Sequence, residues 1–118
     1  MLAPRLRANG RAFAQIAEFH PELTAFRRDL HAHPELGFEE IYTAGRVQQQ
    51  LQVCGVDEIH GGIGKTGIVA LVHGRRSPSA GNPRRMIGLR ADMDALPMAE
   101  LNEFEWRYLL RGPTLATF

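Results

Sequence analysis

The stretch Phe38–Gly55, FEEIYTAGRVQQQLQVCG, contains the clearest secondary-structure signal of the chain. Its apolar residues recur every three or four positions, at Phe38, Ile41, Ala44, Val47 and Leu51. This spacing places them on one face of a helix. Glu39 and Glu40 stand at its start, where the helix dipole favours negative charge, and Gly55 suits the C-terminal cap. The pattern therefore predicts an amphipathic helix.

A second apolar repeat precedes this helix. Apolar side chains again recur at intervals of three or four residues, namely Phe13, Ile16, Phe19, Leu23, Phe26 and Leu30. They predict a first amphipathic helix. Because proline is tolerated in the first turn of a helix and disrupts its interior, Pro21 predicts a kink or a new helix start. Pro34 predicts the end of the helix, and residues 1–12 are expected to form a frayed start.

Strand patterns follow the two helices. After Gly55 the sequence becomes rich in glycine, and the β-branched segment Ile68–Val72 predicts a buried strand. Met86–Ala91 predicts another strand, and the polar residues from Arg75 to Arg85 predict a solvated hairpin connection. Two helices followed by strands of a mixed sheet indicate an α/β fold.

The composition limits the class of protein. A chain of 118 residues with 44% hydrophobic and 23% charged residues fits one globular domain, and its net charge of +1 argues against nucleic acid as a partner. Cys54 is the single cysteine, so no internal disulfide forms and a reducing compartment is expected. Apolar runs fall short of the roughly 18 residues that span a bilayer, and the arginine-rich start lacks the apolar core of a secretory signal. These features predict a cytoplasmic protein without a membrane partner.

The segment Gly62–Gly67, GIGKTG, matches the dinucleotide-binding pattern G-x-G-x-x-G and ends like a P-loop. Both motifs need a helix behind them, because its N-terminal amides hold the phosphates. Here a β-branched strand is predicted to follow, and Ile59 stands where a P-loop needs its first glycine. A glycine turn between strands is therefore favoured over nucleotide binding.

His31 and His33 raise the question of a metal site, because imidazoles are good zinc ligands. On a strand, residues two apart would project to one face. At the end of a helix they point about 200° apart, and Pro34 fixes the exit of the chain. Capping and packing roles are therefore favoured over metal ligation.

Asp92 and Asp94 are the most suggestive functional pair. They alternate at the end of the predicted strand Met86–Ala91, where α/β proteins commonly build their sites. Two carboxylates so close repel each other unless a cation or hydrogen-bond donors compensate. One could bind or orient an imidazole ligand of a metal while the other caps the turn before Leu96 and Pro97. The alternative is an acidic turn on the surface.

Two longer motifs contain these residues. Residues 26–40 read FRRDLHAHPELGFEE, and residues 89–97 read LRADMDALP. In this order they resemble the N-terminal signatures of the metal-dependent amidohydrolases that include hippurate hydrolase and indoleacetyl-amino-acid hydrolases. The helix and the glycine turn between them also fit, so the resemblance extends from Phe19 to Trp106. It implies the N-terminal part of a zinc-peptidase-like catalytic domain.

The resemblance further implies hydrolysis of the amide bond of N-acyl amino acids. In related peptidases a His-x-Asp pair occupies the strand end, where the histidine binds metal and the aspartate orients it. Asp92 stands in the place of that histidine and Asp94 in the place of the aspartate, so Asp94 is a candidate supporting catalytic residue and Asp92 a second candidate. An intact family member would use a divalent metal, zinc or manganese, to activate water and polarise the amide carbonyl. At full length it could also form a homo-oligomer.

The sequence departs from the family pattern after Trp106. The Cys-Gly-His-Asp metal segment of the family and the Glu-Glu pair that follows it do not occur in these 118 residues. No residue is therefore assigned as a metal ligand, and we expect this chain not to bind the metal. Residues 1–12 are expected to be a frayed start, 13–106 a partial catalytic domain and 107–118 an atypical tail, which suggests a truncated and inactive product. The alternative is a small, non-catalytic α/β fragment that acts through association with another subunit.

Overall fold

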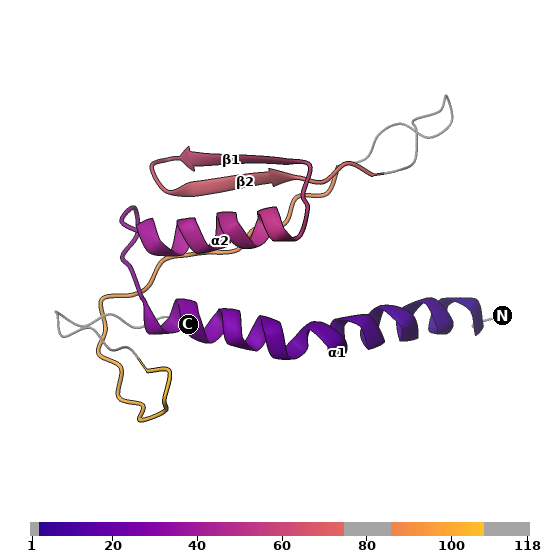
Figure 1. The fold of residues 1–118 in the computed structure, drawn as a ribbon, viewed down its shortest axis with the longest axis horizontal. Helices are drawn as coiled ribbons and strands as arrows, with labels where there is room; N and C mark the ends of the chain where they lie inside the picture. The colour runs from indigo at the N-terminus through magenta and orange to yellow at the C-terminus, as the bar shows by residue number, and fades with distance from the viewer. Residues whose placement is uncertain (1–2, 75–85, 108–118) are drawn as a thin grey trace.

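The structure, a computed structural model, describes residues 3–74 and 86–107 and contains two helices followed by a β-hairpin (Figure 1). The elements in chain order are α1 (Ala3–Ala32), α2 (Ile41–Val53), β1 (Glu58–Ile63) and β2 (Gly67–Leu71). α2 lies between the hairpin and α1, and the segment from residue 86 onward returns past α2 toward the C-terminal end of α1 (Figure 1). This order of elements confirms the predicted α/β class.

α1 is one helix that passes through Pro21. Of the two outcomes predicted at this proline, the new helix start therefore does not occur, because proline removes only its own N–H donor while the neighbouring turns keep theirs. The helix begins at Ala3, so residues 3–12, expected to be frayed, are helical and contain mostly good helix formers. α1 ends at Ala32, before Pro34, as predicted. Within the described ranges, neither helix has the length and apolar character to cross a membrane.

α2 confirms the clearest prediction from the sequence. It ends at Val53, and Gly55 follows with a φ of 70°, the left-handed conformation of a C-terminal glycine cap. The Gly55 N–H donates to the carbonyl oxygen of Gln52. The apolar stripe of α2 is only partly covered, since Ile41 keeps 75% of its surface exposed.

β1 and β2 form an antiparallel hairpin with the pairs Glu58–Leu71, Ile59–Ala70, His60–Val69 and Ile63–Gly67. The turn uses Gly64 and Lys65 at positive φ, 60° and 91°. Gly67 has no room for a side chain, because a Cβ there would lie 2.5 Å from the carbonyl oxygen of Ile63. A strand follows the GIGKTG motif, so the glycine turn between strands is confirmed and no helix N-terminus is placed behind it.

The strand predicted at Met86–Ala91 is wrong. Residues 86–94 have no ladder partner in the part of the chain that the structure describes. Met86, Ile87 and Leu89 are 89%, 86% and 96% exposed. A strand needs a neighbouring strand to pair with its N–H and C=O groups. The local pattern of apolar residues does not show whether such a neighbour is present.

The predicted mixed sheet is accordingly replaced by a two-stranded antiparallel sheet, β1–β2, among the described residues. One parallel bridge, between Leu36 and Ala95, lies outside it. The hairpin connection predicted for Arg75–Arg85 lies outside the described residues.

Candidate functional site

The segments that carry the two sequence motifs, residues 26–40 and 89–97, meet at the C-terminal end of α1. The Ala95 N–H donates a 2.7 Å hydrogen bond to the carbonyl oxygen of Glu35, and Leu36 forms the parallel bridge with Ala95. Ala95 is 3% exposed. The contact therefore fixes the position of the backbone immediately after Asp94.

Asp94 lies beside the turn that follows this bridge. A Cβ built on Gly37 would be 3.8 Å from Oδ2 of Asp94, which is ordinary van der Waals contact. The next residue, Phe38, has a φ of 69°, a conformation that is rare for a bulky side chain. Asp94 itself is exposed, so its carboxylate is open to a ligand.

Asp92 has a different neighbour. Its Oδ1 forms an ion pair of 2.5 Å with Nη2 of Arg90, and the two side chains are 64% and 85% exposed. Arg90 thus supplies the compensating cation that adjacent carboxylates require, although an exposed pair contributes only about 0–1 kcal/mol. This geometry is compatible with a site and with a surface turn, so the roles of Asp92 and Asp94 stay predictions.

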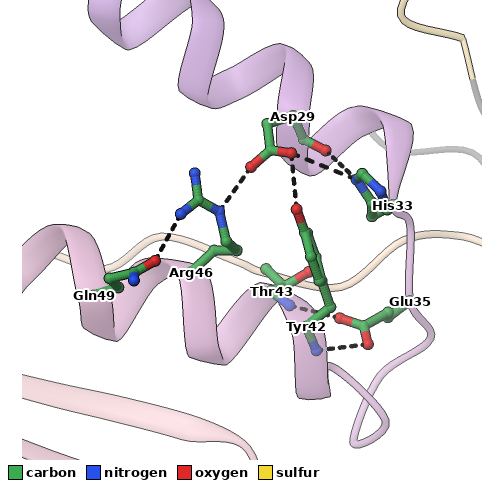
Figure 2. A network of polar contacts seen from close by, with 7 residues as sticks. All are labelled: Asp29, His33, Glu35, Tyr42, Thr43, Arg46 and Gln49. Carbon is green, nitrogen blue, oxygen red and sulfur yellow. Dashed lines mark hydrogen bonds and ion pairs between the residues drawn. The ribbon is translucent and has the colours of Figure 1, made fainter.

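A polar network centred on Asp29 joins α1 to α2 (Figure 2). Oδ1 of Asp29 accepts a 2.8 Å hydrogen bond from the Tyr42 hydroxyl, and Oδ2 accepts one of 2.8 Å from Nε of Arg46. Arg46 donates a further hydrogen bond to the side chain of Gln49, which fixes its guanidinium along α2. The network thus links Asp29 of α1 to Tyr42 and Arg46 of α2.

The charges of this network perturb one another. Burial raises the pKa of Asp29, but the hydrogen bonds from Arg46 and Tyr42 outweigh it and hold that pKa below its ordinary value of 3.8. Burial and the acceptor Asp29 raise the pKa of the Tyr42 hydroxyl, and the hydrogen bond to Asp29 raises the pKa of Arg46. Asp29 is therefore an anion that holds two donors at neutral pH.

Glu35 caps α2 from the preceding connection (Figure 2). Its Oε1 accepts the N–H of Tyr42 and its Oε2 the N–H of Thr43, both at 2.8 Å. The sequence pattern indicated Glu39 and Glu40 as the acidic start of α2 and did not indicate Glu35, because Glu35 lies six residues before the helix. The sequence holds no local signal that distinguishes the three glutamates.

The two motif histidines have separate partners. Nε2 of His31 lies 2.9 Å from Oε1 of Glu100, whereas Nδ1 of His33 donates to the carbonyl oxygen of Asp29 at 2.8 Å. The ring of His33 also packs on Tyr42 with centroids 4.3 Å apart. The packing and capping roles favoured from the sequence are thus what the structure shows. Within the described ranges, no group of three or more His, Cys, Asp or Glu side chains is placed to hold a metal ion.

Comparison with known proteins shows which proteins the chain resembles in sequence. The chain is 40% identical over 93 residues to hippurate hydrolase of Campylobacter jejuni, which covers 79% of this chain and 22% of that enzyme. It is 42% identical over 91 residues to N-acyl-L-amino acid amidohydrolase of Geobacillus stearothermophilus, covering 77% of this chain and 23% of the relative. It is 33% identical over 101 residues to an IAA-amino acid hydrolase of Arabidopsis thaliana, covering 86% and 21%. No family model and no solved structure matches the chain.

The relatives that the chain matches are named as hydrolases and amidohydrolases. The chain belongs to the amidohydrolase family that includes hippurate hydrolase and N-acyl-L-amino acid amidohydrolase, as the two motifs predicted. It spans about a fifth of the length of these relatives.

Proposed function

We propose that this chain forms part of the catalytic domain of an enzyme that hydrolyses the amide bond of N-acyl amino acids. The identity to hippurate hydrolase over most of the chain carries the proposal. The hydrogen bond between Ala95 and Glu35 supports it, because it joins the two motifs into one structural unit. In this proposal residues 13–106 are the partial catalytic domain, 1–12 and 107–118 flank it, and the enzyme works in the cytoplasm.

Asp94 is the candidate supporting catalytic residue and Asp92 the second candidate. The longer enzyme uses a divalent metal, zinc or manganese, and could be a homo-oligomer. Protein sites for catalytic zinc use three side-chain ligands, and the described residues place no such group around the two aspartates. The residues that the structure describes therefore do not fit a metal on their own. We propose that the 118-residue chain alone has no turnover.

The test compares this chain with the native polypeptide that contains it. That polypeptide is isolated from its source through the peptide His31–Pro34 and its intact mass is measured. Each protein is then given N-benzoylglycine with zinc or manganese, and release of glycine is followed. We expect a mass well above 13.2 kDa and glycine release by the native protein only.

The outcomes separate the parts of the proposal. Glycine release by the 118-residue chain contradicts the proposal that this chain alone has no turnover. A native protein of larger mass that cleaves neither this substrate nor other N-acyl amino acids contradicts the function. A native mass of 13.2 kDa contradicts the longer enzyme and leaves a truncated product.

A second candidate function is association of a non-catalytic α/β fragment with another subunit. The observation that favours it is the exposed apolar surface of the extended segment, where Leu89 and Leu101 are 96% and 90% exposed. Sedimentation of the purified chain at several concentrations tests it. A chain that is monomeric, unfolds cooperatively and binds no hydrophobic dye contradicts this function, whereas a stable complex with a second protein in the source supports it.

A further inference from the structure

A partly buried contact between His31 and Glu100 holds the segment after Asp94 against α1. Nε2 of His31 lies 2.9 Å from Oε1 of Glu100, and the two side chains are 13% and 5% exposed. The other ion pairs among the described residues all keep at least 28% of each side chain exposed. The partners are 69 positions apart in the chain, so the pair is a tertiary contact rather than a feature of the helix.

Aromatic contacts continue this attachment along the same face of α1. The His31 ring lies 5.6 Å from the Phe104 ring, and Phe104 stacks on Trp106 with centroids 4.8 Å apart. The guanidinium of Arg28 lies 3.6 Å from the Trp106 ring centroid. Arg28 and His31 are three residues apart, which places them on one helix face.

Stacking is the main contact of Arg28 in this attachment. Its Nε is buried and has no hydrogen-bond partner among the described residues. Among the described residues, the directional contact between α1 and the returning segment is the hydrogen bond between His31 and the carboxylate of Glu100.

The attachment lies close to the candidate catalytic residue. Ala95 follows Asp94 directly and is hydrogen-bonded to Glu35, and Glu100 comes five residues later. Because the Asp94 side chain is exposed, its position depends on the backbone around it, which includes the segment that follows. Fixing the chain at Ala95 and at Glu100 restrains the direction in which the segment leaves the Asp92–Asp94 turn.

We propose that His31 and Glu100 are positioning residues, which hold the Asp92–Asp94 turn against the connection between α1 and α2. The inference rests on the proposed function, because the position of Asp94 matters for catalysis only if this residue supports the reaction. His31 thereby gains a role beyond the packing that its place at a helix end implied.

The experiment measures amide hydrogen exchange at Ala95 in the 118-residue chain by NMR, together with the carboxyl ¹³C signal of Asp94. His31→Ala should speed exchange at Ala95 by about tenfold, because the segment then opens more often. His31→Gln keeps an N–H donor toward Glu100 and should return exchange to within about threefold of the parent, with the Asp94 signal restored. His20→Ala, which changes an exposed histidine of the same helix, should alter neither readout.

The amides of the hairpin show whether the rest of the chain is still folded. Unchanged exchange at Ala95 in His31→Ala, with the hairpin protected, overturns the inference. Equal acceleration in His31→Gln and His31→Ala overturns it too, since the donor to Glu100 is then irrelevant. If His31→Ala unfolds the hairpin, Glu100→Gln replaces it: faster exchange at Ala95 supports the inference and unchanged exchange overturns it.

These readouts do not depend on turnover. A coupling between His31 and the Asp94 signal in a protein that cleaves no N-acyl amino acid contradicts the proposed function alone. Amide hydrolysis by the longer native protein without this coupling in the chain contradicts the positioning role alone.

Discussion

The hydroxyl of Thr66 donates a 2.5 Å hydrogen bond to the carboxylate of Glu40. Glu40 is 6% exposed and stands directly before α2, whereas Thr66 belongs to the turn of the hairpin. Burial raises the pKa of Glu40, but the hydrogen bond from Thr66 and backbone N–H donors lower it below its ordinary value. The threonine of the GIGKTG motif thus attaches the hairpin to the start of α2.

Replacing this hydroxyl should loosen the hairpin. Thr66→Val keeps the shape of the side chain but removes the side-chain donor of the buried Glu40 carboxylate, which keeps only its backbone N–H donors, so we expect a loss of about 1–3 kcal/mol in the free energy of unfolding. Thr66→Ser keeps the donor and should lose less. Urea denaturation compares the two variants, with Thr24→Val on α1 as a control. A Thr66→Val protein as stable as Thr66→Ser contradicts the role of the hydroxyl.

Stability should fall in acid. Asp29 and Glu40 have folded pKa values below their ordinary values of 3.8 and 4.5. Their charged forms therefore stabilise the folded chain above the ordinary pKa, and this contribution is lost as the pH falls through the lower folded pKa. Urea midpoints should be flat from about pH 7 to 5 and decrease below about pH 4.5. Asp29→Asn should reduce the slope of that decrease, and an unchanged slope would show that Asp29 is not responsible.

Removing the side chain of Glu35 should destabilise the chain more than removing that of Glu39. Glu35→Ala removes the acceptor of two N–H groups at the start of α2, which should cost about 1–2 kcal/mol. Glu39→Ala changes an exposed glutamate next to the same helix and should stay within about 0.5 kcal/mol of the parent. Helix content by circular dichroism and urea midpoints test the pair. Equal losses in both variants would mean that net charge, rather than capping, stabilises the helix.

What the sequence predicted well is local. The period of the apolar residues in α2 and the glycines of the hairpin turn depend on neighbours within a few positions, and both predictions are confirmed. The end of α1 before Pro34 follows from the same kind of rule. Each of these features depends on residues that lie close together in the sequence.

What the sequence did not predict depends on distant partners. Met86–Ala91 has the pattern of a strand but no ladder partner among the described residues. Glu35 caps a helix that begins six residues later, and Glu100 pairs with His31 across 69 positions. Such contacts depend on the three-dimensional path of the chain. The spacing of residues in the sequence does not reveal that path. The sequence indicated that the Asp92–Asp94 pair needs a compensating cation or hydrogen-bond donors. For Asp92, the guanidinium of Arg90 is that cation.

Two glycines should respond to alanine with opposite signs. Gly45 lies within α2, and a Cβ there would meet no atom within 4 Å, so Gly45→Ala should stabilise the chain by about 1 kcal/mol through the helix propensity of alanine. At Gly67 a Cβ would lie 2.5 Å from the carbonyl oxygen of Ile63, a backbone atom that cannot move without disturbing the strand pairing. Gly67→Ala should therefore destabilise the hairpin by about 1–3 kcal/mol. Thermal unfolding followed by circular dichroism measures both, and because the two substitutions add the same methyl group, equal signs would contradict the close approach of the strands at Gly67.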